Sequence, residues 1–133
     1  MTELKFRAWD NVTKRYWNVG GLSFEKGKLI EVYLENYPTS FEGNEDCKKP
    51  DDVILEQNTG LKDKNDKEIY EGDIVLVNGN IRYYVDFEFG GFWLNNDNIK
   101  WKANRAFTHF VEWNDIEVIG NIHENPELLE KEK

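Results

Sequence analysis

The carboxylates of the polar segment 63–68 are the residues of this chain whose types and spacing come closest to a chemical site. A calcium-binding loop that began at Asp63 would need an oxygen ligand at its fifth position, glycine at its sixth and glutamate at its twelfth. The chain has Lys67, Glu68 and Ile74 at those positions. We therefore expect a solvated turn between two strands at this segment, and no bound metal ion.

Histidine, cysteine and serine offer little for catalysis. His109 and His123 do not stand at a zinc-binding helix spacing, and the chain has no Gly-x-Ser-x-Gly motif. Cys47 lies between Asp46 and Lys48, and an adjacent carboxylate does not favour the reactive thiolate. We therefore expect no enzyme activity and no cofactor. The alternative, a hydrolase, would need a histidine within hydrogen-bonding reach of a carboxylate in a concave pocket.

The composition is that of a well-solvated, folded chain of 133 residues, in which 32% of the residues are charged and 14% are aromatic. The formal net charge of −9 disfavours non-specific binding to nucleic acid, because such a surface repels phosphates. The N-terminus has no apolar signal segment, and no apolar run approaches the roughly 20 residues of a membrane helix. A single cysteine excludes an internal disulfide. These features predict a cytoplasmic protein that does not enter membranes.

Alternation of apolar and polar residues predicts antiparallel strands in the first half of the chain. Gly20-Gly21 is expected to end the second of these strands. The polar segment 36–52, which contains two prolines, predicts a long loop. The strands are expected at residues 4–9, 15–19, 28–34 and 53–55.

The second half carries the clearest local signals. Residues 73–95 predict a three-stranded meander, because Asn78-Gly79 is a preferred pair for a type I′ hairpin turn. The odd-numbered residues of 81–89 are apolar and are expected to share one face of the middle strand. Residues 96–113 fit both a strand and a helix, with a slight preference for a strand.

The C-terminal part predicts one more strand and a short helix. Residues 116–122 have the apolar pattern of a strand, in which Gly120 marks a bulge or a close approach of the backbone. Asn125 suits the N-cap of a short helix and Pro126 suits its first turn. Residues 130–133 are expected to fray.

These elements predict a mainly β fold. We expect a small SH3-like or barrel-type antiparallel sheet, with hairpins and a short C-terminal helix. The chain length predicts that residues 1–133 form a single domain.

One part of the meander is a candidate binding surface. Exposed aromatic rings stack nucleobases, and nearby cations neutralise phosphates. The same aromatic residues also suit a core or a subunit interface, where Trp and Tyr are enriched, and the net charge favours this second interpretation. The candidate residues are Tyr84, Trp93, Lys100, Trp101, Lys102 and Arg105.

Four sequence blocks follow one another along nearly the whole chain. They are Lys-Phe-Arg-Ala-Trp-Asp at residues 5–10, Gln-Asn-Thr-Gly-Leu-Lys-Asp-Lys-Asn at 57–65, Glu-Ile-Tyr-Glu-Gly-Asp-Ile-Val at 68–75, and Glu-Val-Ile-Gly-Asn-Ile-His-Glu-Asn-Pro-Glu-Leu-Leu at 117–129. In these blocks the chain resembles the YopX family of small proteins encoded by bacteriophages and prophages. Two departures are Asp66, where a glycine is usual, and His123, where a tyrosine is common.

The resemblance implies a mostly β fold with barrel character, and a phage-type protein that works inside a bacterial cell. It implies no catalytic residues. The resemblance leaves the function open. The missing catalytic motifs, the many aromatic residues and the acidic character favour a non-catalytic, self-associating module that binds a phage or host protein. The alternative is a nucleic-acid-associated regulator that uses the aromatic and basic surface.

Overall fold

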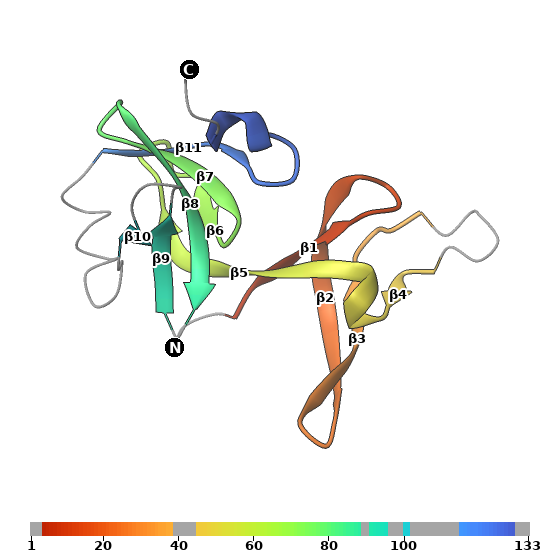
Figure 1. Cartoon of the computed structure of the whole chain (residues 1–133). Helices are drawn as coiled ribbons and strands as arrows, with labels where there is room; N and C mark the ends of the chain where they lie inside the picture. Colours follow the sequence, from red (N-terminus) through yellow and green to blue (C-terminus); the bar gives the residue numbers. More distant parts are fainter. Residues whose placement is uncertain (1–3, 39–44, 89–90, 96–99, 102–114, 130–133) are drawn as a thin grey trace. The chain divides into compact units, whose positions relative to one another are not determined.

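The computed structural model describes residues 4–38, 45–88, 91–95, 100–101 and 115–129. Antiparallel strands dominate these residues (Figure 1), which confirms the predicted mainly β fold. No helix in the described ranges is long and apolar enough to cross a membrane. The elements are β1 Phe6–Asp10, β2 Arg15–Glu25, β3 Lys28–Leu34, β4 Cys47–Lys48, the 3₁₀ helix η1 Pro50–Asp52, β5 Val53–Lys62, β6 Glu68–Tyr70, β7 Asp73–Val77, β8 Ile81–Glu88, β9 Gly91–Asn95, β10 Lys100–Trp101, β11 Ile116–Asn121 and the 3₁₀ helix η2 Pro126–Leu129.

The chain groups into two compact units, and the boundary between them falls inside β5. Residues 4–57 form the N-terminal unit, and residues 58–133 with 1–3 form the C-terminal unit. The first half of β5 pairs with β1, and its second half pairs with β6. The two units are groups of residues that pack compactly, and this grouping does not test whether they fold as one domain. The single domain expected from the sequence therefore stays a prediction.

The N-terminal unit is built around β1, which pairs antiparallel with β2 on one side and with β5 on the other. Ala8 of β1 is fully buried, because strand alternation turns it toward the apolar core of this unit. The strands predicted at the start of this unit are thereby confirmed. The buried apolar residues of the core are Ala8, Val32, Leu34, Tyr37 and Val53.

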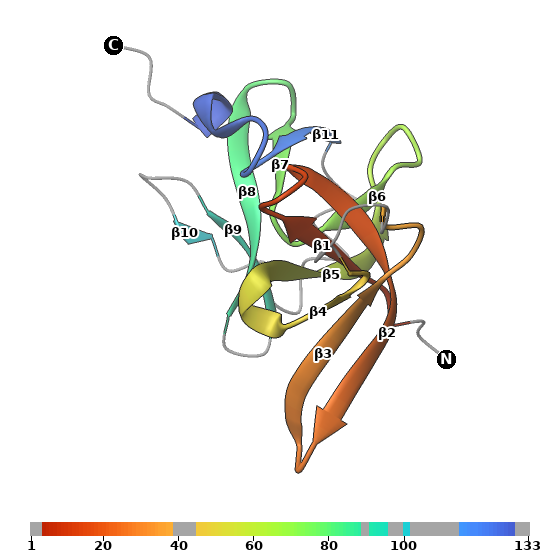
Figure 2. The same ribbon diagram turned by 90° about the vertical axis from the view of Figure 1, so that its right-hand side faces the viewer.

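β2 is longer than the sequence indicates, because it continues through Gly20-Gly21 to Glu25. The prediction that the glycine pair ends this strand is therefore wrong. The pairing with β3 shifts between Val19 and Gly21, so Gly20 is the extra residue of a β-bulge. A Cβ atom on Gly20 would lie 2.9 Å from Glu35 Cγ, which explains the glycine. In Figures 1 and 2 the β2–β3 hairpin, in orange, runs out beyond the ends of β1 and β5.

In the C-terminal unit, β7, β8 and β9 form the predicted meander. Asn78 and Gly79 have φ angles of 51° and 74°, the left-handed values that a type I′ turn requires, so this turn is confirmed. One face of the sheet carries the core, to which β8 contributes Tyr83 and Val85, whereas Ile81 and Phe87 nearer the ends of β8 are 42% and 40% exposed. The buried residues of this core are Ile69, Val75, Val77, Tyr83, Val85, Leu94 and Ile116.

β11 contains the irregularity predicted at Gly120. Its register with β7 shifts between Val118 and Gly120, which is a bulge. A Cβ atom on Gly120 would lie 2.6 Å from Asn125 Oδ1. The same oxygen accepts a hydrogen bond from the Asn121 amide at 3.3 Å. Gly120 therefore lets the turn after β11 fold back onto the strand.

Several finer predictions are not confirmed. In the described strands both sheets are open, with the orders β4-β3-β2-β1-β5-β6 and β10-β9-β8-β7-β11, so an SH3-like barrel is not seen. The expected C-terminal helix is a 3₁₀ helix of four residues, Pro126–Leu129, because so short a segment does not sustain an α-helix. The predicted loop 36–52 contains β4 and η1, and its residues 39–44 lie outside the described part. Residues 96–113 are described at β10 alone, and the predicted frayed tail 130–133 is also outside.

Candidate functional site

The aromatic candidates Tyr84 and Trp93 lie on the face of the C-terminal sheet that is opposite its core. Tyr84 pairs with Asn95, and Trp93 pairs with Asp86, so these four side chains share one face. Asn95 Nδ2 donates a hydrogen bond to Asp86 Oδ2 at 3.1 Å. The structure therefore brings Tyr84 and Trp93 together as diagonal neighbours, and the charged residue between them is acidic.

The other four candidates are described less fully. β10, which carries Lys100 and Trp101, pairs with β9 and so joins the same sheet. Lys102 and Arg105 lie outside the described residues. The basic character expected of this surface therefore stays a prediction.

Asp63 is a buried carboxylate that organises the turn between β5 and β6. Its Oδ1 accepts hydrogen bonds from the amides of Asn65 and Lys67, each at 2.9 Å. Its Oδ2 accepts a hydrogen bond from the Val118 amide of β11 at 2.8 Å. The interpretation of segment 63–68 as a turn between strands is confirmed. The carboxylate holds the turn against β11.

Two further buried carboxylates also bind structural partners. Asp73 Oδ2 accepts a hydrogen bond from the Tyr70 amide at 2.8 Å, and so holds the turn at the entrance of β7. Glu56 Oε1 forms an ion pair with Arg7 Nε at 3.0 Å, and both side chains are largely buried. The Arg7 guanidinium also lies 3.9 Å from the centre of the Tyr16 ring, a cation–π contact. These interactions tie neighbouring strands together.

Asp10, at the end of β1, is 1% exposed and receives several hydrogen bonds. The donors are the hydroxyls of Tyr37, at 2.5 Å, and Thr13, at 2.8 Å, and the amides of Thr13 and Val12. Burial raises the pKa of the Asp10 carboxyl, but these hydrogen bonds together hold that pKa below its ordinary value of 3.8. Asp10 is therefore an ionised anchor of the β1–β2 turn at neutral pH.

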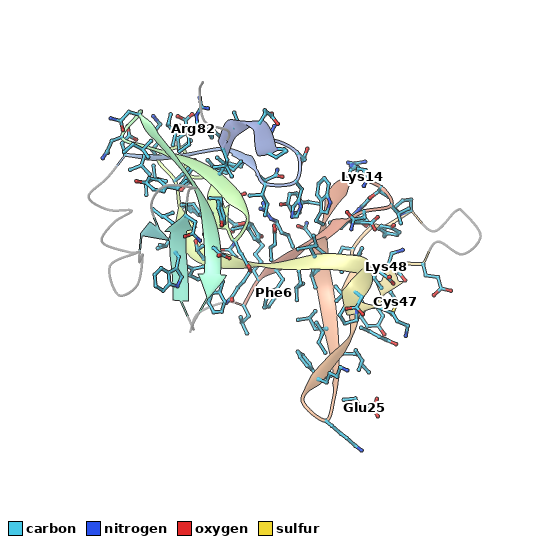
Figure 3. The ribbon with its side chains drawn as sticks, viewed as in Figure 1. Phe6, Lys14, Glu25, Cys47, Lys48 and Arg82 are labelled. Atoms are coloured by element: carbon cyan, nitrogen blue, oxygen red, sulfur yellow. The ribbon has the colours of Figure 1, made fainter. Side chains whose placement is uncertain are left out.

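Glu31, Tyr33 and Cys47 form a cluster of titratable side chains where β3 meets β4 (Figure 3 labels Cys47). Tyr33 Oη donates a hydrogen bond to Glu31 Oε2 at 2.7 Å, and this raises the pKa of Tyr33 to about 12. The same bond lowers the pKa of Glu31. Burial and the bond to Glu31 raise the pKa of Cys47. The thiol and the phenol are therefore protonated at neutral pH, and neither is an activated nucleophile.

The described part of the chain does not show a metal site, and it includes one of the two histidines. No three His, Cys, Asp or Glu side chains gather there in a way that would hold a metal ion. The His123 amide donates a hydrogen bond to Asn121 Oδ1 at 3.1 Å, within the turn after β11. His109 lies outside the described residues, so a histidine-based site stays untested.

An exposed aromatic side chain on the β2–β3 hairpin is a feature that sequence reasoning missed. Phe24 is 61% exposed near the end of β2. Register pairs Leu22 with Val32 and Phe24 with Leu29, so these residues share one face of the hairpin. Val32 belongs to the core of the N-terminal unit, Leu22 and Leu29 pack against it, and Phe24 extends this face into solvent. The alternation from Leu22 to Phe24 was the available signal, but the expected strand end at the glycine pair concealed it. We call this β2–β3 segment, residues 19–34, the hairpin arm.

A family model described as YopX protein matches residues 5–130. The chain belongs to the YopX family. Among solved structures, this YopX chain is similar to protein EF1440 from Enterococcus faecalis, with a TM-score of 0.69 and 28% sequence identity. The match covers 98% of this chain and 100% of that chain. No curated protein matches this chain.

The blocks that resemble the YopX family contain residues that shape the backbone. Gly60 and Gly72 have φ angles of 82° and 87°, which other residues rarely adopt. The Gly72 amide donates to Val85 O at 2.7 Å, and Gly72 O accepts from the Ile122 amide at 2.9 Å. Gly72 thus connects β8 with the end of β11. These positions have an architectural role in the YopX fold.

Proposed function

We propose that this chain is a non-catalytic protein-interaction module of phage or prophage origin, which self-associates and binds a phage or host protein in the bacterial cytoplasm. The observation that carries this proposal is the hairpin arm, on which Phe24 is 61% exposed. An exposed large apolar side chain on an extended strand is the kind of surface through which proteins bind one another.

The chemistry of the described carboxylates supports the non-catalytic part. Asp63 and Asp73 accept backbone hydrogen bonds, Glu56 binds an arginine, and Asp10 is held ionised by its donors. A general acid or base needs a pKa near the working pH and an accessible proton. These carboxylates instead stabilise turns and strand pairs.

Two measurements test the proposal. Size-exclusion chromatography with light scattering on the full chain is expected to give a mass above that of one chain. A mass of one chain at every concentration would contradict self-association. Affinity purification from nuclease-treated lysate of infected host cells, followed by mass spectrometry, is expected to recover a specific protein. Recovery of nucleic acid alone, in a parallel purification without nuclease, would contradict the protein partner.

The second candidate is a nucleic-acid-associated regulator, which the shared face of Tyr84 and Trp93 favours. Stacking on these rings would quench tryptophan fluorescence when single-stranded DNA is added. The variant Trp93→Leu is expected to lose that change. Binding to DNA with an affinity unchanged in Trp93→Leu would exclude this surface.

A further inference from the structure

The hairpin arm has an open strand edge. β2 pairs with β1 over Arg15–Asn18, and from Val19 onward its pairing among the described residues is with β3 alone. The side of β2 that faces away from β3 therefore presents backbone N–H and C=O groups to any strand that approaches it. Beyond the short pairing of β4 with Val32 and Tyr33 the arm is a two-stranded ribbon, which is marginally stable by itself, and a further strand would stabilise it. Glu25, labelled in Figure 3, marks the end of this edge at the tip of the arm.

Side chains beside this edge are apolar on one face. Leu22 and Phe24 lie on the face that also carries Leu29, and Phe24 is the most exposed of these residues. Ser23 lies between them on the opposite face, where it pairs with Glu31. From Gly21 to Glu25 β2 itself has no extra residue, because the second register shift, between Ser23 and Phe24, comes from Ile30 of β3. The free side of β2 can therefore accept a neighbouring strand.

The charge of the arm does not oppose contact between two arms. Residues 19–34 contain two acidic residues, Glu25 and Glu31, and two basic residues, Lys26 and Lys28, so the arm has no net charge. The net charge of −9 is therefore carried entirely by the rest of the chain. Two chains of net charge −9 repel each other as a whole, whereas two arms add no net repulsion where they approach.

We propose that the free edge of β2 pairs antiparallel with the same edge of a second copy of this chain, around a two-fold axis at Ser23. This inference rests on the proposed self-association and names its surface. In a two-fold antiparallel pair, residues equally distant from the axis face each other. An axis at Ser23 places each Phe24 beside Leu22 of the second copy, on one face. It places each Glu25 opposite Gly21 of the second copy, so that no like charges face each other.

Charge introduced at the exposed ring tests the surface. In light scattering on the full chain, Phe24→Lys is expected to raise the dimer dissociation constant at least about tenfold, because a lysine on an edge strand opposes pairing. The matched control is Val12→Lys, since Val12 is 74% exposed in the β1–β2 turn of the same unit. This control is expected to dimerise like the unaltered chain. Circular dichroism is expected to show the same strand content in both variants.

A cysteine at the proposed axis tests the register. Across an antiparallel pair, facing Cα atoms lie about 4.5–5.5 Å apart, within the range that a disulfide spans. In a Cys47→Ser background, Ser23→Cys is expected to give a disulfide-linked dimer on mild oxidation. Val12→Cys in the same background is expected to stay monomeric under denaturing, non-reducing electrophoresis.

The outcomes separate this inference from the broader proposal. If the unaltered chain dimerises and Phe24→Lys dimerises equally well, the arm is not the interface, while self-association stands. If Phe24→Lys disrupts the dimer but Ser23→Cys does not cross-link, the two-fold register is wrong. If the unaltered chain is a monomer at every concentration, both self-association and this inference are overturned.

Discussion

Removal of the Asp63 carboxylate is expected to destabilise the C-terminal unit. Asp63 is 7% exposed and accepts backbone hydrogen bonds from Asn65, Lys67 and Val118. Two of these donors belong to its own turn, and the third belongs to β11. The substitution Asp63→Ala therefore loosens the turn and at the same time breaks its attachment to β11.

The magnitude follows from what happens to each donor. A hydrogen bond to a charged group contributes about 1.5–3 kcal/mol when its loss leaves a donor unsatisfied. The amides of Asn65 and Lys67 belong to exposed residues, so water replaces most of what they lose. The amide of Val118 lies in a half-buried strand and loses the full amount. The sum is about 3 kcal/mol for Asp63→Ala.

Urea unfolding followed by circular dichroism measures this loss as a change in the free energy of unfolding. Asp66→Asn is the control, because the Asp66 side chain is 84% exposed in the same turn and lies 3.6 Å from Lys62 Nζ. Such a surface pair contributes about 0.5 kcal/mol or less. Equal losses for Asp63→Ala and Asp66→Asn would refute the reasoning that the attachment to β11 stabilises the unit.

Two more predictions concern other contacts. Gly120→Ala is expected to cost about 1–3 kcal/mol in urea unfolding, because its Cβ would clash with Asn125 Oδ1, and Asn125→Ala is expected to relieve part of that loss; strictly additive losses would contradict the clash. Asp10 has a lowered pKa in the folded chain, so it stabilises the fold above its ordinary pKa of 3.8, and this stability is lost as the pH falls through the folded pKa. Tyr37→Phe removes one of the hydrogen bonds that lower the pKa of Asp10, so we expect lower stability at neutral pH and a weaker dependence of stability on pH below about 4. If the free energy of unfolding keeps the same dependence on pH in Tyr37→Phe, Asp10 does not have this role.

The parts of the fold that follow from short-range chemistry could be predicted from the sequence. The Asn78-Gly79 turn needs two residues that tolerate positive φ, and the chain supplies them at the point where the apolar alternation changes strand. Gly120 was recognised because a glycine inside a strand pattern has a local cause. Sheet closure depends instead on pairings between distant strands, which local patterns do not encode. The barrel that the predicted elements and the resemblance both suggested is therefore not seen, and the described strands form open sheets.

Prediction of the candidate surfaces succeeded and failed for similar reasons. Strand alternation placed Tyr84 and Trp93 on the face away from the core, and the register of β8 with β9 agrees. The end of β2 was predicted wrongly at Gly20, because a glycine that ends a strand and a glycine that makes a bulge look alike in sequence. The deciding contact is with Glu35, fifteen residues later, and no local pattern reveals it. The hairpin arm was hidden by this single ambiguity.

The division of β5 between the two units has a consequence for synthesis on the ribosome. Every strand partner of β1 has been made once Gln57 is translated, since β1 pairs with β2 and with the first half of β5. Once Gln57 has also left the ribosome, the N-terminal unit is free to fold while the remainder of the chain is still being translated. The second half of β5 leaves the ribosome next, and β6 is the first strand made after it that can pair with it.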